Sequence, residues 1–245
     1  MFNMEKMWRR KLEKERRFNA DHGLYMLFWI FLLGSVGGFV LEGVWSVVRW
    51  GGWQHHTGVV WGPFCTVYGL GAAAMYVAVS LLPAREMPRW KTVLARFLAC
   101  ALAGTLAEYL VSFFQEMWFG SLSWDYSAQK WNIGGRVSAG MSMIWGTVGL
   151  LFMQIVCPAM RALISRVNGQ KGYIATWALV VFMGVNLLVS AAAVDRWRER
   201  GENIPPQSAM DIKMDEHFGD ERMERLFPNM QFCEPGTYSY ADHAA

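Results

Sequence analysis

The chain has none of the short signatures that mark nucleotide hydrolysis, zinc binding or thiol redox chemistry. No Walker phosphate-binding sequence occurs in its 245 residues. Its four cysteines form no C-x-x-C pair. The adjacent histidines His55 and His56 project in different directions and have no acidic or thiol residue near them in sequence, which is not the usual spacing of a metal site. We therefore expect no cofactor, no metal and no nucleic-acid partner.

Charge is also nearly absent from several long stretches. The composition is 53% hydrophobic and 15% aromatic, with 13 Trp and a mean hydropathy of +0.16. A membrane-spanning helix needs about 20 mostly apolar residues. Runs of this kind lie near 24–48, 59–82, 92–114, 139–164 and 173–194. The sequence predicts an all-α protein, a polytopic transmembrane helix bundle of about five spans over residues 24–194, whose environment is a lipid bilayer.

The segment before the first span, residues 1–23, is polar and basic. The first apolar run is too long for the core of a secretory signal and no Ala-x-Ala follows it, so we predict no cleaved signal. Met4, Trp8 and Leu12 recur at helical spacing among Lys and Arg. This pattern suits a helix on an anionic inner leaflet. A solvated basic segment explains it equally well.

The distribution of Lys and Arg predicts the orientation. With the N-terminus inside, the inner connections 83–91 and 161–172 each hold three basic residues, whereas the outer ones hold Arg49 and then Lys130 with Arg136. By the positive-inside rule this favours a multi-pass membrane protein with a cytoplasmic N-terminus.

The tail, residues 195–245, is polar and acidic overall, and it does not follow the charge rule simply. Five spans would place its first basic residues, at 196, 198 and 200, on the outside. The sequence therefore leaves the side of the tail open. Met210, Met214 and Phe218 stand at helical spacing and predict one short amphipathic helix in this tail.

The second run contains residues that interrupt regular helices. Gly62 and Pro63 stand near its start, and Gly69 and Gly71 follow. Proline removes a backbone donor and clashes with the preceding turn. Broken helices in membranes often line a cavity, and in transporters they point to a binding site. Tyr68 lies about one turn beyond the predicted break. A simple proline kink is the alternative interpretation.

Three carboxylates occur inside or at the ends of apolar runs. Glu42 follows a glycine-rich face of the first run and either faces a polar interior or is solvated near the outer interface. Glu108, Ser112 and Glu116 are four apart, so they form one polar stripe on a helix. Arg136 is the candidate ion-pair partner of this stripe, with a structural or a functional role.

The linker between the third and fourth runs, Ser121–Arg136, is unusually rich in aromatic and polar residues. Asp readily caps a local turn, and the Gly134-Gly135 pair allows a sharp one. We predict an ordered extracytoplasmic loop, which either covers a solute pocket or braces the bundle. Its candidate binding residues, besides Arg136, are Trp124, Asp125, Tyr126 and Asn132.

Several blocks together resemble one bacterial membrane family, the putative ABC-transporter type IV permeases, or CmpB-like proteins. The resemblance covers about residues 24–195 and the stretch MDEHFGDERMERLFPN. It rests on Gly38 with Glu42, GPFCTVYGLGA at 62–72, EYLVSFFQE at 108–116, WDYSAQKWNIGGR at 124–136 and WGTVGLLF at 145–152. Thr66 stands where the family commonly has proline, so the helix break is expected to be softer. The resemblance implies a permease-like protein.

Three functions are compatible with these features. The first is a membrane transport protein or accessory subunit that binds a small solute in a polar pocket near the outer face, with an ATPase, another transporter subunit or a second copy as partner. Inner connections of about ten residues leave little room for coupling segments and favour an accessory role. The second is an intramembrane enzyme acting on lipid or cell-envelope precursors, which no Ser–His or metal constellation supports. The third is a structural or regulatory partner protein.

Overall fold

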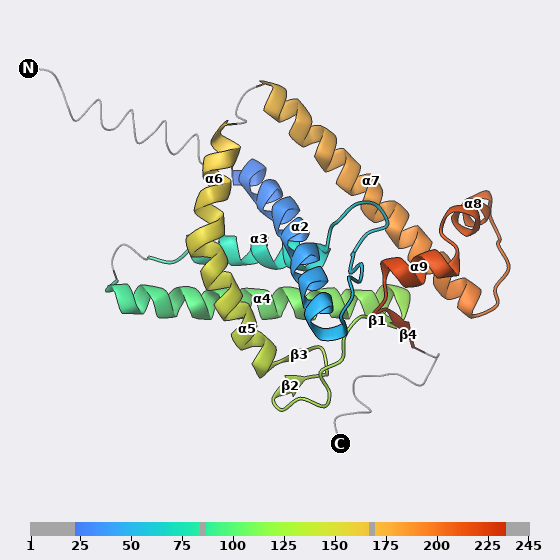
Figure 1. Cartoon of the computed structure of the whole chain (residues 1–245), viewed down its shortest axis with the longest axis horizontal. Coiled ribbons are helices and arrows are strands. Elements are labelled where there is room, and N and C mark those ends of the chain that lie inside the picture. The colour runs from blue at the N-terminus through green and yellow to red at the C-terminus, as the bar shows by residue number, and fades with distance from the viewer. Residues whose placement is uncertain (1–22, 84–86, 167–169, 234–245) are drawn as a thin grey trace, which may run out of the picture.

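The computed structural model describes residues 23–83, 87–166 and 170–233, and these ranges are mostly helical (Figure 1). The α-helices are α2 (Gly23–Trp50), α3 (Thr66–Ser80), α4 (Arg89–Phe119), α5 (Ala139–Leu151), α6 (Cys157–Arg166), α7 (Gln170–Gly201), α8 (Ala209–His217) and α9 (Asp220–Leu226). The two-residue strands are β1 (Ser121–Leu122), β2 (Asn132–Ile133), β3 (Val137–Ser138) and β4 (Gln231–Phe232), paired antiparallel as β1 with β4 and β2 with β3. The predicted basic N-terminal helix lies outside the described residues.

Four stretches of the described chain are helical, apolar and long enough to cross a membrane: Gly23–Trp50, Arg89–Phe119, Ala139–Met160 and Gly172–Gly201. The protein is thus an all-α polytopic membrane protein, as predicted. The expected second span is shorter than its apolar run. Helix α3 has 15 residues and begins at Thr66, which gives it a length of about 22 Å against a bilayer core of about 30 Å.

The loop before α3 contains a short segment that is buried although it is not helical. Val59 and Val60 in this loop are almost inaccessible to solvent. The Val60 backbone N–H donates to Ser190 Oγ at 2.9 Å. The side-chain amide of Asn186 exchanges two hydrogen bonds with the backbone of Trp61, at 3.1 and 2.7 Å. Non-helical backbone is tolerated at membrane depth where protein groups satisfy it in this way.

Helices α2 and α3 touch through glycine. A Cβ atom built on Gly38 would lie 2.4 Å from Tyr68 Cβ, and one on Gly69 would lie 2.5 Å from the Phe31 carbonyl oxygen. The predicted helix break at Gly69 and Gly71 is wrong, because both residues lie inside the uninterrupted α3. Gly62, with φ +81°, lies in the preceding loop. These helical glycines allow close packing rather than a break.

The expected span at 139–164 is divided by a wider turn. Helix α5 continues into a π-helical segment, η2 (Phe152–Val156), and then into α6. Pro158 has no N–H, and its ring would collide with the carbonyl of Gln154 in a regular α-helix. Gln154 lies in the π-helical turn, so we attribute the widened turn to this proline.

The tail folds back on the end of α7. Met214, Phe218, Met223 and Phe227 pack with Val60, Ala193 and Val194 in one buried cluster. The prediction of a single amphipathic helix is wrong: two short helices form, and Met210 is 57% exposed. Helix α8 begins with a capping box in which Ser208 and Asp211 bond each other's backbone N–H groups.

Three connections meet at one end of the bundle, which we call the loop end: residues 51–65, the linker 120–138, and the tail from 202 to 233. Strand β1 of the linker pairs with β4 of the tail, with Ser121 opposite Phe232. Thr57 Oγ1 donates to the Leu226 carbonyl at 2.9 Å. The described part of the tail, up to residue 233, therefore lies at the same end of the bundle as the linker.

The arginines at the end of α7 are neutralised by their surroundings. Arg196 contacts Asp215 at 2.9 Å and Glu199 at 2.9 Å, and Arg200 contacts Asp215 at 2.6 Å. Arg196, followed by Arg200, holds the pKa of the Asp215 carboxyl below its usual value. Residues 195–233 contain nine acidic and six basic residues. By the count of Lys and Arg alone these arginines would favour the inner side, whereas the structure pairs each of them with a carboxylate.

Candidate functional site

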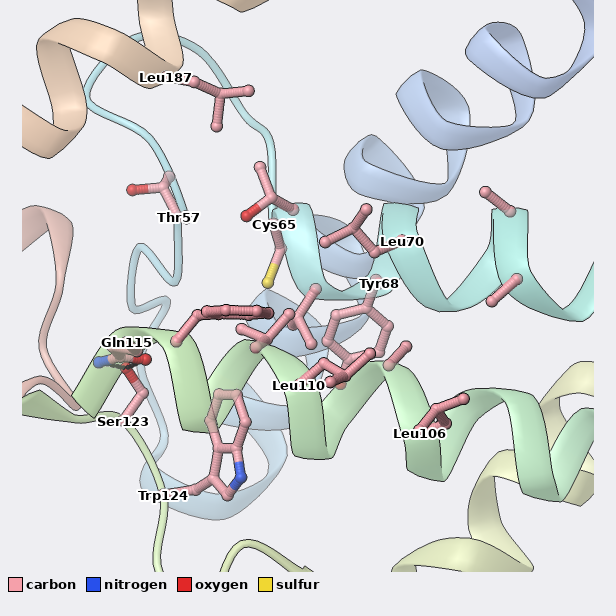
Figure 2. A pocket seen from close by; sticks show the side chains of 18 of the residues that line it. Thr57, Cys65, Tyr68, Leu70, Leu106, Leu110, Gln115, Ser123, Trp124 and Leu187 are labelled. Atoms are coloured by element: carbon pink, nitrogen blue, oxygen red, sulfur yellow. Dashed lines mark hydrogen bonds between the residues drawn. The ribbon is translucent and has the colours of Figure 1, made fainter. Parts of the chain in front are cut away.

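A cavity of about 1270 Å³ lies along α3 and α4, and α7 and the loop end contribute further walls to it (Figure 2). One part of its lining comes from the first turn of α3 and the last turns of α4. Other parts come from the linker, the loop before α3 and the tail near Phe227–Met230. Ligand sites commonly measure about 300–1000 Å³, so this cavity has room for more than a small ion.

The polar groups of this lining are concentrated toward the loop end, where they lie among apolar side chains such as Phe119, Val194 and Phe227. The polar side chains belong to the loop end or to nearby helix turns, and they are Glu42, His56, Thr57, Thr66, Tyr68, Gln115, Ser123 and Asn229, with Ser190 on α7. Further along α3 and α4 the lining consists mainly of Leu and Ala, with a few other apolar residues. It includes Leu70, Ala74, Val77, Leu102 and Leu106. The cavity is therefore amphipathic along its length.

The central contact at the polar end joins Glu42 to Tyr68. The tyrosine hydroxyl donates to Glu42 Oε1 at 2.5 Å. Gly38, one turn before Glu42, leaves the space into which the Tyr68 side chain fits. The Tyr68 ring also lies against the ring of Trp145 on α5, with 5.4 Å between their centroids. Both polar partners line the cavity.

Glu108 is the most deeply buried of the three predicted carboxylates, at 4% exposed. Its Oε2 accepts from Trp145 Nε1 at 2.9 Å, and its Oε1 accepts from the Tyr126 hydroxyl at 2.9 Å. Both donors are neutral, and one of them belongs to the linker. Glu108 does not line the cavity but connects α4, α5 and the linker behind the Tyr68–Trp145 wall.

Arg136 pairs with one end of the predicted polar stripe, the carboxylate of Glu116. Its guanidinium also lies 3.4 Å from Ser112 Oγ and above the rings of Tyr109 and Phe113, at 5.9 and 5.6 Å from their centroids. A partly buried arginine held by a carboxylate and two aromatic faces is fixed in place. This contact anchors the linker to α4.

The rest of the linker is ordered by its own hydrogen bonds. Trp124 Nε1 donates to the Arg136 carbonyl at 3.0 Å, and the backbone N–H of Tyr126 donates to Gly135 O at 2.7 Å. Asn132 Nδ2 donates to the Gln129 carbonyl at 2.8 Å. Asp125 accepts from the Ser127 backbone at 2.8 Å, which is the local turn predicted for it.

The candidate residues thus divide into three groups. Glu42, Tyr68 and Trp124 line the cavity. Glu108, Glu116, Tyr126 and Arg136 hold the linker against the helices. Asp125 and Asn132 bond only within the linker in the contacts above, and Gly62 with Pro63 lies in the loop before α3.

Sequence reasoning missed Trp145, which contacts both Tyr68 and Glu108. An indole N–H is a donor that needs a partner when it is buried, and this Trp stands in the middle of an apolar run. That signal could have found it. Within the described ranges, no group of three His, Cys, Asp or Glu residues could hold a metal ion.

Comparison with known proteins gives one finding. A family model described as "Putative ABC-transporter type IV" matches residues 29–191, about two thirds of the chain. The match covers the cavity-lining turns of α2, α3 and α4, and the whole linker. No curated protein and no solved structure matches the chain.

Proposed function

Because the chain belongs to the family described as "Putative ABC-transporter type IV", we propose that it is a transport subunit that binds its solute in the cavity at the loop end. The observation that carries this proposal is the Glu42–Tyr68 pair at the polar end of a cavity of about 1270 Å³. Carboxylates inside membrane bundles are costly and commonly mark solute or ion pathways.

The linker is proposed to act as the cover of this site. Trp124 and Ser123 line the cavity, and the same segment is tied to α4 through Arg136 and Glu116. Tyr126 joins it to the buried Glu108. A ligand that contacts Trp124 would therefore contact the same segment that Arg136 and Tyr126 tie to α4.

The proposed role is that of an accessory or binding subunit rather than a complete permease. At the end opposite the loop end, only about eight residues separate α3 from α4, and the gap between α6 and α7 is shorter still. Such connections are ordinary short helix–helix loops and offer little surface for an ATPase to push on. We propose an ATPase or another transporter subunit as partner, in a bacterial cytoplasmic membrane with the N-terminus inside.

The test is an uptake comparison that works for a solute of any identity. Cells lacking the native gene and expressing the wild-type chain, Glu42→Gln, Tyr68→Phe or Glu224→Gln are fed a uniformly ¹³C-labelled cell hydrolysate, and labelled compounds inside are measured by mass spectrometry. Glu224 is an exposed tail carboxylate and serves as the matched control.

We expect at least one labelled compound to fall about tenfold in Glu42→Gln and to be unchanged in Glu224→Gln, because a charge-assisted contact is worth about that factor. Membrane levels of each variant are measured in parallel. Identical uptake profiles for Glu42→Gln, Tyr68→Phe and wild type, at equal protein levels, would refute the proposed binding site.

A further inference from the structure

The cavity is much longer than a small polar solute requires. Its lining follows α3 from Tyr68 to Leu81, a rise of about 20 Å at the α-helical spacing. Over that distance the α3 and α4 walls are built from Ala, Leu and Val, as in the view of Leu70, Leu106 and Leu110 in Figure 2. A wall of this length and composition fits an extended hydrocarbon chain.

The apolar part of the cavity is open along its side. Leu102 and Leu106, which line it, are 73% and 55% exposed. Both lie in the middle of the spanning helix α4, where the surroundings are the hydrocarbon core of the bilayer. A hydrocarbon chain could therefore enter sideways from the bilayer without passing through water.

The charge at the polar end is of one sign. Among the lining residues in the described ranges, Glu42 is the only Asp, Glu, Lys or Arg. His56, the other titratable side chain with basic character there, has Nδ1 at 3.2 Å from Asn229 Nδ2. This contact joins His56, in the loop before α3, to the tail.

Arg136, the arginine that the sequence suggested as an ion-pair partner, adds no positive charge to the cavity lining. Arg136 is paired with Glu116 and lies over the Tyr109 and Phe113 rings, and it does not line the cavity. A phosphate or carboxylate head would thus meet a carboxylate and neither Lys nor Arg in the described part of the lining, which is unfavourable in a low-dielectric site. An ammonium head would pair with Glu42.

We propose that the ligand of this cavity is a single-chain amphiphile with a positively charged amine head, bound with the head at Glu42 and the chain along α3 and α4. This identification of the ligand class rests on the proposed binding function of the same site. The tyrosine hydroxyl of Tyr68 keeps Glu42 oriented toward the head group.

The test uses two photoreactive probes that differ only in the head group. One is hexadecylamine and the other is hexadecanoic acid, each with a diazirine at the same chain position. The purified full-length chain in phosphatidylcholine nanodiscs is irradiated with each probe, and labelled peptides are identified by mass spectrometry. Unlabelled hexadecylamine serves as competitor.

We expect the amine to label α3 and α4 peptides about tenfold more than the acid, with competition by unlabelled amine. Glu42→Gln should lower amine labelling about tenfold while still accepting the Tyr68 hydrogen bond, and Glu224→Gln should not change it. Ala78→Phe, which narrows the apolar part away from Glu42, should remove labelling beyond position 78.

Equal labelling by the amine and the acid, unchanged in Glu42→Gln, would show ordinary lipid contact and would overturn the amine inference. If no peptide is labelled and the particles contain twice the expected protein mass, a second copy of the chain fills the cavity. That result would also overturn the amine inference. Equal labelling by the two probes leaves the uptake experiment with the ¹³C-labelled hydrolysate undecided, so failure of the ligand class is distinguishable from failure of the proposed function. A cavity filled by a second copy would count against both.

Discussion

Glu108 shows how single residues hold the site together. It is a carboxylate in the middle of a spanning helix, and its hydrogen bonds come from Trp145 and Tyr126 rather than from a cation. The two donors differ in one respect. An indole N–H can only donate, whereas a phenol hydroxyl can also accept.

This difference predicts the behaviour of two substitutions. Glu108→Gln should fold normally, because the amide oxygen can accept from Trp145 while the amide nitrogen donates to the Tyr126 oxygen. Glu108→Ala should lower the free energy of unfolding by about 1–3 kcal/mol, because the buried Trp145 N–H is left unsatisfied. Thermal unfolding in detergent measures both. Equal destabilisation by the two variants would mean that the carboxylate charge itself is required for folding.

For single residues, the sequence predicted which polar side chains are important better than it predicted their partners. Polar residues in apolar runs are conspicuous, which identified Glu42 and Glu108, and Arg136 was identified at the end of the polar linker. The partners were harder, because the polar stripe on α4 offered both Glu108 and Glu116 to the arginine. The two carboxylates differ in burial. Arg136 binds the more accessible Glu116, whereas the buried Glu108 accepts hydrogen bonds from neutral donors.

At the scale of elements, the position of Tyr68 depends on the close contact between α2 and α3. Gly38 and Gly37 are neighbours on α2 with opposite surroundings. A Cβ on Gly38 would lie 2.4 Å from Tyr68, whereas one on Gly37 meets nothing within 4 Å. The pair therefore provides a substitution and its matched control.

We expect Gly38→Ala to lower the free energy of unfolding by about 1–3 kcal/mol, because overpacking forces the helices apart. It should also weaken Glu42-dependent uptake, since Tyr68 is displaced. Gly37→Ala should be neutral or slightly stabilising, because alanine favours the helix. Chemical denaturation in detergent would show the difference. Similar stabilities of the two variants would contradict the close contact.

The helical runs could be predicted from hydropathy, but the loop before α3 could not. Val59 and Val60 are as apolar as helix residues, and local composition does not show that their backbone groups are satisfied elsewhere. The backbone partners of Val60 and Trp61 in this loop, Ser190 and Asn186, lie more than a hundred residues away on α7. Burial by a distant element is not visible in a local pattern.

The contact between α7 and α8 should be sensitive to acid. The pKa of Asp215 is lowered by Arg196 and Arg200, so its ionised form stabilises the folded tail. This contribution is fully present above the usual aspartate pKa of about 3.9 and is lost as the pH falls through the lowered value. We expect amide hydrogen exchange in α8 and α9, corrected for intrinsic rates, to rise below about pH 4.

The matched variant for this prediction is Asp215→Asn, which should show the faster exchange already at pH 6 and little further change on acidification. Glu224→Gln should behave like the wild-type chain. Exchange that rises below pH 4 to the same extent in Asp215→Asn and in wild type would assign the acid sensitivity to other carboxylates.

At the scale of the whole molecule, the structure groups the first loop, the linker and the tail at one end. This arrangement predicts that cysteines replacing Lys130 and Gln231, both exposed, react alike with a membrane-impermeant maleimide in intact spheroplasts. A cysteine replacing Ser80, at the far end of α3, should react oppositely. Cys233→Ser provides the background, since the remaining cysteines are buried.

Labelling at position 231 only after lysis, with labelling at position 130 before it, would separate the tail from the linker and contradict the β1–β4 pairing. The sequence alone could not decide this side, because the arginines at 196–200 resemble an inside signal. Arg196 and Arg200 also pair with carboxylates from later in the tail, Asp215 and Asp220, and only folding brings these groups together.

The central claim is that the amphipathic cavity beside Glu42 and Tyr68 is a ligand site. A cryo-electron microscopy map of the full-length protein in nanodiscs of its native lipids tests it most directly. We predict elongated non-protein density along α3 and α4 that reaches Glu42 and weakens in a map of Glu42→Gln. A cavity filled by a helix of a second copy, or density that is the same in both maps, would contradict the claim.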